Sequence, residues 1–192
     1  MPSSNDQHSK FVVNYNIMST PTELINLLRR LRAVREFDSK PIPDAALQDI
    51  LEVARWTGSG MNSQPWHLVV VKQPEVLQQI GQSEGYIKFV THAQAAIVPA
   101  VESAADGFDE GRLAERILLA ATAHGLGAAL GWLQGGGQVS VRTLLNIPAN
   151  YRVRTVIALG YPTEAALQPK AKPGEARKAL AEIVSYEKFG AG

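Results

Sequence analysis

Residues 109–133 read DEGRLAERILLAATAHGLGAALGWL, and this stretch decides the fold. Acidic residues lead it, and Gly125 can adopt the left-handed backbone that ends a helix. A helix is therefore predicted from Asp109 to His124, with apolar groups recurring at helical spacing at Leu113, Ile117, Leu118 and Ala121. The apolar run 126–133 then predicts a buried strand. Such a helix followed at once by such a strand is typical of a layered domain.

Outward from this stretch, helical and extended patterns alternate. Thr20-Pro21-Thr22-Glu23 has the spacing of a capping box with proline at the first helical position, so a helix begins there. Further helices are expected over 44–54, 74–80 and 139–145, with a last one ending near Tyr186, and strands over 66–71, 95–98 and 153–159. The pattern predicts one α/β or α+β layered domain over residues 20–192, after a loose arm at 1–19.

Composition excludes several classes of protein. The chain has 192 residues with 19 basic and 18 acidic side chains, so its formal charge of +1 gives no pull toward nucleic acid or an anionic membrane. It contains no cysteine, which excludes disulfides and thiolate chemistry and is compatible with the cytoplasm. The uncharged stretch 117–141 is long enough to cross a bilayer, but its glycines break it into shorter pieces of a soluble protein.

Several common catalytic motifs fail on spacing. There is no G-K-[ST] phosphate loop, and Gly125-x-Gly127 continues to Leu130 where a dinucleotide-binding motif needs its third glycine. Ser59 lacks the glycines two positions away that a nucleophile elbow requires. The four histidines have no metal-ligand spacing. We therefore expect neither a metal centre nor a hydrolytic triad.

Two basic clusters remain as candidates for binding an anion. The first is made of Arg29, Arg30, Arg32 and Arg35. The second is made of Lys170, Lys172 and Arg177. Guanidinium groups bind phosphate oxygens in a bidentate way, so the two clusters would form a phosphate clamp if they met in space. The alternative is a solvated basic face for the first cluster and a solvated loop for the second.

Two further segments suit a flat ligand. The loop 59–66 reads SGMNSQPW, and its Ser59, Asn62 and Gln64 offer donors and acceptors suited to a heteroaromatic ring with a polyol tail. Residues 125–132 are apolar and small, and could form a smooth wall for such a ring. An ordinary loop and a tightly packed core strand explain the same residues equally well.

In this order, the segments resemble the FMN-dependent nitroreductase family. That family has an R-S-x-R-like element, an A-P-S-x-x-N-x-Q-P-W loop, a helix ending L-A-A-x-x-x-G-L-G, then L-G-Y-P and a basic element before the last helix. The matching segments are 32–35, 57–66, 119–127, 159–162 and 176–178. The resemblance covers about residues 20–189.

The resemblance implies an α+β three-layer fold, with a mixed central sheet flanked by helices, in an intertwined homodimer that holds FMN between its chains. It implies hydride transfer from NADH or NADPH through FMN to a small acceptor such as a nitroaromatic or a quinone, with no residue acting as acid or base. Arg32 and Arg177 would hold the phosphate, and Arg35 would lie near the ribityl chain or the pyrimidine edge. The residues expected at the cofactor are Arg32, Ala33, Arg35, Ser59, Asn62, Gln64, Leu130, Gly131, Trp132 and Arg177.

Departures from the family pattern keep alternatives open. Ala33 replaces the usual serine and Gly58 the usual proline, and one lost neutral hydrogen bond weakens FMN binding by about 0.5–1.5 kcal/mol. The segment 83–109 is short for the helices that cover the substrate in the family. A non-catalytic flavin- or nucleotide-binding protein and an anion-binding regulatory domain are therefore alternatives. Flavin-fragmenting and dehalogenating enzymes are rivals within the family that no sequence feature establishes.

Overall fold

The computed structural model describes residues 20–168 and 177–190. The elements follow in the order α1 (Pro21–Arg30), α2 (Asp44–Arg55), η1 (Gly60–Asn62), β1 (Trp66–Val71), α3 (Pro74–Gly81), β2 (Gly85–Tyr86), η2 (Lys88–His92), β3 (Ala95–Glu102), α4 (Gly107–Ala123), β4 (Gly127–Leu133), α5 (Gly135–Leu144), β5 (Tyr151–Arg152), β6 (Thr155–Gly160), α6 (Glu164–Leu167) and η3 (Leu180–Glu182). The expected arm at 1–19, with Lys170 and Lys172, lies outside the described residues.

The six strands form one sheet in the order β1-β3-β6-β4-β2, with β5 paired to the end of β3. All of these pairs are antiparallel. One parallel bridge, between Ala33 and Ala128, adds the segment after α1 to the edge of β4 and makes the sheet mixed. The central strands β3 and β6 are almost wholly buried, because helices cover both of their faces.

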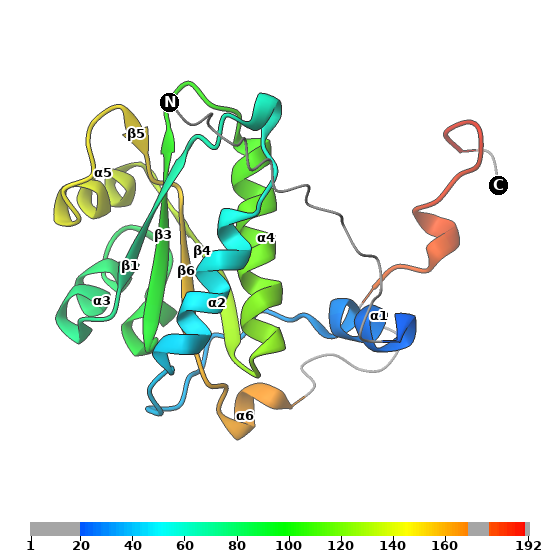
Figure 1. Ribbon diagram of the computed structural model, residues 1–192, viewed down its shortest axis with the longest axis horizontal. Helices are drawn as coiled ribbons and strands as arrows, with labels where there is room; N and C mark the ends of the chain where they lie inside the picture. The colour runs from blue at the N-terminus through cyan, green and yellow to red at the C-terminus, as the bar shows by residue number, and fades with distance from the viewer. Residues whose placement is uncertain (1–19, 169–176, 191–192) are drawn as a thin grey trace, which may run out of the picture.

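Helices cover the sheet on both sides and make three layers (Figure 1). On one face, α2 and α4 pack on apolar side chains such as Ile97, Ile157 and Leu159. On the other face, residues of α3 and α5 such as Leu77 and Val141 pack on the opposite side of the same strands. The two hydrophobic cores confirm the expected α+β three-layer architecture.

Local signals in the sequence correctly placed several helix ends. The capping box is present: the Thr20 hydroxyl accepts from the Glu23 N–H at 3.3 Å, and the Glu23 carboxylate accepts from the Thr20 N–H at 2.8 Å. Gly125 has φ +70°, so α4 ends in the left-handed conformation that glycine allows. The stretch 117–141 is divided there between α4 and β4, and no helix within 20–168 or 177–190 is long and apolar enough to cross a bilayer.

Three expected elements differ from the structure. The helix expected from Val139 begins at Gly135. Its first turn includes Gly137, where a side chain would collide with the backbone of Glu84, so these glycines serve close packing and do not end the helix. The strand expected over 95–98 continues to Glu102 by pairing with β1 and β5. The last helix, expected to end near Tyr186, is only the short turn η3, because nothing within the described residues buries its apolar side chains.

A buried ion pair ties α4 to the sheet. Glu110 is 5% exposed, and its carboxylate accepts from the Thr155 hydroxyl at 3.0 Å and lies 3.7 Å from Arg152 Nη2. Arg152 Nη1 donates to the carbonyl oxygens of Glu102 and Ala105, each at 2.7 Å. The pair therefore joins the start of α4 to β5, β6 and the turn that leads out of β3.

Replacing Arg152 with methionine is expected to lower the free energy of unfolding by about 3 kcal/mol, because the Glu110 carboxylate stays buried without its cation. Urea denaturation of both proteins measures the difference. The matched control is Arg142→Met on α5, an arginine with no ion pair among the described residues. A loss below about 1 kcal/mol for Arg152→Met would show that the pair contributes little.

Candidate functional site

The segment after α1 lies against the edge of β4. The Val34 N–H donates to the Ala128 carbonyl at 2.9 Å, and a Cβ on Gly127 would lie 2.6 Å from Val34 Cγ1. Ala33 therefore pairs with the sheet through its backbone. Only a glycine at position 127 leaves room for the Val34 side chain. This contact brings Arg32, Ala33 and Arg35 to the strand that carries Leu130, Gly131 and Trp132.

The arginines of this segment have no ion pair in the described part of the chain. Arg32 Nη1 donates to the carbonyl oxygens of Arg29 and Leu31, each at 2.7 Å, and so caps the end of α1. The Arg35 guanidinium lies 5.6 Å from the ring centre of Phe89. Arg32 and Arg35 are thus held in place, and no carboxylate of the described residues pairs with either.

The second half of β4, from Leu130 to Trp132, presents an exposed apolar face. Leu130 is 38% and Trp132 48% exposed, and both point to the same face of the strand. Gly131 is buried toward the other face, where a Cβ would lie 3.1 Å from the Phe89 ring. Tyr86, opposite Trp132 across the β2–β4 pair, is 75% exposed. The alternative of a core strand is therefore wrong for Leu130 and Trp132.

The loop 59–64 is a rigid turn. The Ser59 hydroxyl accepts from the Gln64 N–H at 2.8 Å, and Gln64 Nε2 donates to the Asn62 carbonyl at 3.3 Å. Met61, Asn62 and Gln64 all have positive φ, of 50°, 55° and 48°. The Asn62 side-chain amide has no hydrogen bond within the described residues and is exposed, so it is available to a ligand.

The loop is anchored to the first turns of α4. The Gly60 N–H donates to Asp109 Oδ2 at 3.0 Å, and Arg112 Nη1 lies 3.3 Å from Asp109 Oδ1. A Cβ on Gly58 would lie 2.9 Å from Arg112 Nη2, so the glycine that replaces the family proline faces this arginine. The sequence pattern does not place Asp109, Arg112, Phe89 and Tyr86 at the site, because their contacts join distant segments.

The helix before the loop ends in an exposed charged cluster. The Glu52 carboxylate accepts from the Arg55 guanidinium and, at 2.8 Å, from the Trp56 indole N–H. The Arg55 hydrogen bond, followed by that of Trp56, lowers the pKa of Glu52 to about 2. The Glu52 carboxylate therefore stays ionised at neutral pH. Its hydrogen bond holds the Trp56 side chain, just before the loop starts.

Within one chain, the loop and the arginine segment lie at opposite ends of α4. The loop contacts the first turns of this 17-residue helix, and the arginine segment contacts Ala128, just beyond its last turn. A helix of that length measures about 25 Å. Figure 1 shows the loop past one end of α4 and α1 near the other. The structure therefore does not bring Ser59, Asn62 and Gln64 together with Arg32 in the same chain.

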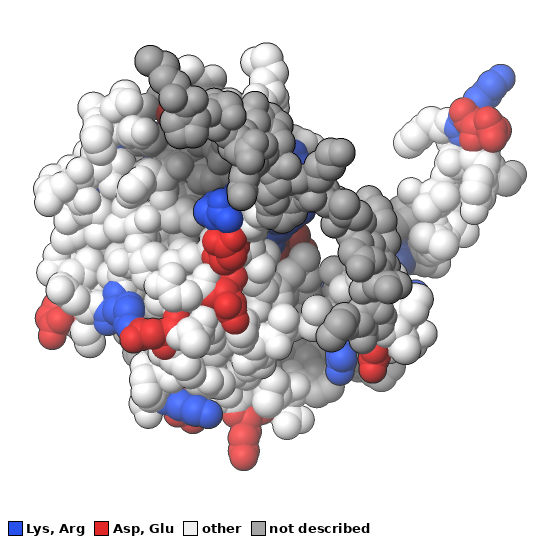
Figure 2. Space-filling view, in the orientation of Figure 1, with Lys and Arg blue, Asp and Glu red and all other residues white. Residues whose placement is uncertain are grey.

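Arg177 begins the segment 177–190, in which every residue is exposed. This segment stands away from the layered body in both views (Figures 1 and 2). On the face drawn in Figure 2, basic and acidic side chains are interspersed, as expected for a formal charge of +1. The large exposed apolar side chains of the segment are those of Leu180, Ile183, Val184, Tyr186 and Phe189.

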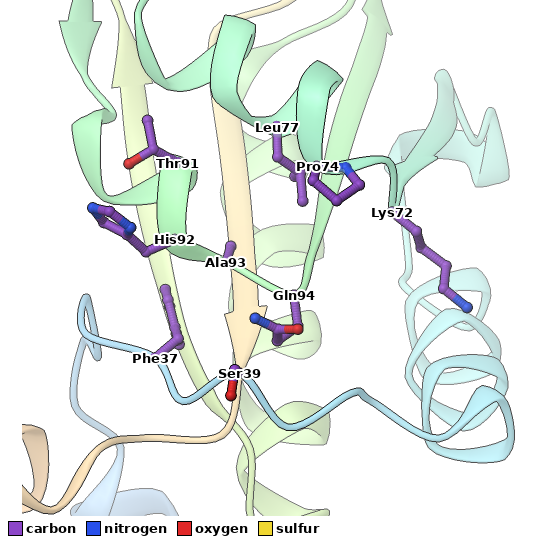
Figure 3. A pocket seen from close by; sticks show the side chains of 9 residues that line it. All are labelled: Phe37, Ser39, Lys72, Pro74, Leu77, Thr91, His92, Ala93 and Gln94. Carbon is purple, nitrogen blue, oxygen red and sulfur yellow. The ribbon is translucent and has the colours of Figure 1, made fainter.

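A separate cavity of about 320 Å³ opens between the residues after the arginine segment and η2 (Figure 3). None of the residues predicted at the cofactor lines it. Its Lys72 extends away toward α2, where Nζ contacts Asp44 at 2.6 Å and lowers the pKa of that carboxyl group. The cavity therefore lacks a free cation for a phosphate, although Ser39 and Gln94 line it with polar groups.

Known proteins share this sequence pattern. The family model described as the nitroreductase family matches residues 28–102. A protein from Methanothermobacter thermautotrophicus, named as a candidate NADH dehydrogenase/NAD(P)H nitroreductase, is 30% identical over 166 residues, covering 82% of this chain and 87% of that one. An NADH dehydrogenase from Thermus thermophilus is 25% identical over 173 residues, covering 69% and 83%.

Solved structures share the fold. An FMN-dependent nitroreductase from Clostridium difficile superposes with a TM-score of 0.77 at 24% identity, over 86% of this chain and 99% of that one. An iodotyrosine deiodinase bound to FMN and 3-iodo-L-tyrosine superposes with a TM-score of 0.71 at 24% identity, over 86% and 100%. Fold and sequence together define a layered α+β oxidoreductase domain. The chain belongs to the nitroreductase family.

Proposed function

We propose that the protein is an FMN-dependent NAD(P)H oxidoreductase of the cytoplasm that reduces a small acceptor such as a nitroaromatic or a quinone. One observation carries the proposal: the Arg32–Arg35 segment is hydrogen-bonded to β4 beside the exposed side chains of Leu130 and Trp132. Cations that have no ion pair within residues 20–168 and 177–190, and that lie next to an apolar face, suit the phosphate and the ring of a flat, phosphorylated coenzyme.

The residues present fit FMN. Arg32 retains guanidinium N–H groups beyond those that cap α1, and with Arg177 it would hold the phosphate. Arg35 would contribute positive charge near the ribityl chain or the pyrimidine edge. The side chains of the loop would line the ring and the ribityl chain, as would the backbone of Ala33 and residues 130–132 of β4.

FMN held by these residues would supply the redox chemistry for hydride transfer from a nicotinamide to the acceptor. The chain's own groups would bind and orient the reactants. Arg35 would add a positive charge that favours electron uptake at the site. The apolar face of Leu130 and Trp132 would exclude water from one side of the ring, and Tyr86 extends that face toward solvent. No residue of this chain is assigned as an acid or a base.

A homodimer would complete the site. Because the loop and the arginine segment lie at opposite ends of α4, a second copy related by a twofold axis would place the loop of one chain at the arginines of the other. Three surfaces support this arrangement. Two are apolar, namely the exposed residues Leu24, Ile25 and Leu28 of α1 and the large side chains of the segment 177–190. The third is a groove of about 560 Å³ along α4, which Gly107, Phe108 and Gly111 line together with the charged residues Arg112, Glu115 and Arg116.

Anaerobic stopped-flow reduction tests the proposed activity. The purified protein is expected to be yellow and to lose its flavin absorbance on mixing with NADH or NADPH. Reoxidation would then follow with an acceptor from a panel of nitroaromatics, quinones and 3-iodo-L-tyrosine, the last included because of the deiodinase structure with this fold. A protein that binds no FMN, or whose FMN neither nicotinamide reduces, would contradict the proposal.

The same measurement decides the second candidate, a non-catalytic flavin-binding protein. The absence of a hydroxyl at Ala33 and the short segments β2 and η2, in place of longer covering helices, favour this alternative. A yellow protein whose flavin neither nicotinamide reduces would support the non-catalytic alternative. Reduction of the flavin by either nicotinamide within seconds of mixing would exclude it.

A further inference from the structure

The arginine segment carries more positive charge than an FMN phosphate needs. Four guanidiniums lie within positions 29–35, and no ion pair in the described part of the chain offsets them. A phosphate monoester carries a charge of about −1.5 to −2 near pH 7. In the proposed site, Arg32 and Arg177 match that charge and Arg35 lies toward the ring. Arg29 and Arg30 are then surplus.

The two surplus arginines lie in the same helical turn. Both are exposed in the last turn of α1. Arg32 Nη1 donates to the Arg29 carbonyl at 2.7 Å, which holds the predicted phosphate ligand against the same turn. Arg30 Nε donates to the Asn26 carbonyl at 3.2 Å, and no hydrogen bond or ion pair among the described residues uses its terminal nitrogens or the Arg29 guanidinium.

The helix end explains only part of this charge. Cations near the carboxyl end of a helix interact favourably with its carbonyl groups, and Arg32 already caps two of them. Arg29 and Arg30 add two further charges in the turn that Arg32 caps, so this end of α1 favours a second anion. Arginine forks match the terminal oxygens of a phosphate monoester in a bidentate way.

We infer that Arg29 and Arg30 recognise the 2′-phosphate of NADPH and make it the preferred nicotinamide, an inference that rests on the proposed function. The 2′-phosphate is the group that distinguishes NADPH from NADH, and an arginine near the ribose is a known way to accept it. Both nicotinamides carry the pyrophosphate, whose phosphate groups each bear a single charge. Two guanidiniums within one helical turn supply the charge that suits the doubly charged monoester.

The test compares wild type with Arg29→Gln/Arg30→Gln. Reduction of the flavin is followed by stopped flow with NADPH and with NADH, and the FMN content of each protein is measured beforehand. Wild type is expected to favour NADPH by about tenfold or more, and the double variant to lose that preference while its reaction with NADH changes less than about twofold. The matched control, Arg142→Gln on α5, is expected to behave as wild type.

A second readout does not depend on turnover. Calorimetric titration is expected to show 2′,5′-ADP binding to wild type about tenfold more tightly than 5′-AMP, with the difference lost in the double variant. Equal affinities in wild type would overturn the inference, as would an equal loss with both nicotinamides or loss of FMN from the double variant. If neither nicotinamide reduces the flavin, the proposed function fails, and this titration still decides whether the arginines bind the monoester.

Discussion

Replacing both Arg32 and Arg177 with alanine is expected to give a folded but colourless protein. Each guanidinium would supply charge-assisted hydrogen bonds to the FMN phosphate, and the loss of both should weaken FMN binding at least about 100-fold. Flavin absorbance relative to protein absorbance, followed by fluorescence titration with added FMN, measures the change. Arg32 also caps α1, so circular dichroism must accompany the titration.

The matched control removes the same charge elsewhere. Arg142→Ala with Lys40→Ala replaces a cation on α5 and one that lies 4.2 Å from the Tyr161 ring, and it should retain FMN. If the Arg32/Arg177 variant keeps wild-type affinity for FMN, the assignment of these two arginines to the phosphate is wrong. If the control variant also loses FMN, the effect is one of net charge.

Replacing Gly111 with glutamate is expected to produce a monomer that does not retain FMN. Nothing lies within 4 Å of the position that a Cβ on Gly111 would take, and Gly107 lies one turn before it. Glycine inside a helix costs about 0.5–1 kcal/mol relative to other residues, so the substitution should stabilise an isolated chain. The open groove at Gly111 therefore suits the close approach of a partner, and a charged side chain there would block it.

Gly135→Glu is the matched control. Gly135 also has nothing within 4 Å of its Cβ position, but it lies in the first turn of α5, in the opposite layer. Size-exclusion chromatography with light scattering gives the mass of each variant, and absorbance gives its FMN content. A Gly111→Glu protein that stays dimeric with full FMN would exclude α4 from the interface.

Much of the fold could be predicted because its signals are local. The capping box at Thr20 and the stop at Gly125 depend on residues within one or two turns, and both are present. The start of the helix through Gly136 and Gly137 could not be predicted, because these two glycines pack against Glu84 in a distant segment. The last helix was predicted wrongly, since an apolar pattern does not reveal whether its covering surface lies in the same chain.

The candidate site was predictable only in its parts. The residue types of the arginine segment, the loop and β4 indicated an anion and a flat ring. The contact between Val34 and Gly127 joins the arginine segment to β4. It could be found only from the structure. The separation of Ser59 from Arg32 along α4 also needed the structure, because this separation depends on how distant segments pack on the helix.

A mixed dimer tests most directly whether each site is shared between two chains. One chain carries Arg32→Ala/Arg35→Ala, and the other carries Asn62→Gly/Gln64→Gly, in which glycine keeps the positive φ of both positions. With distinct tags, the mixed dimer can be purified away from both parents, each of which should lack FMN. A shared site predicts about one FMN per mixed dimer, because one pocket receives intact arginines and an intact loop. A mixed dimer that binds no FMN would contradict this account.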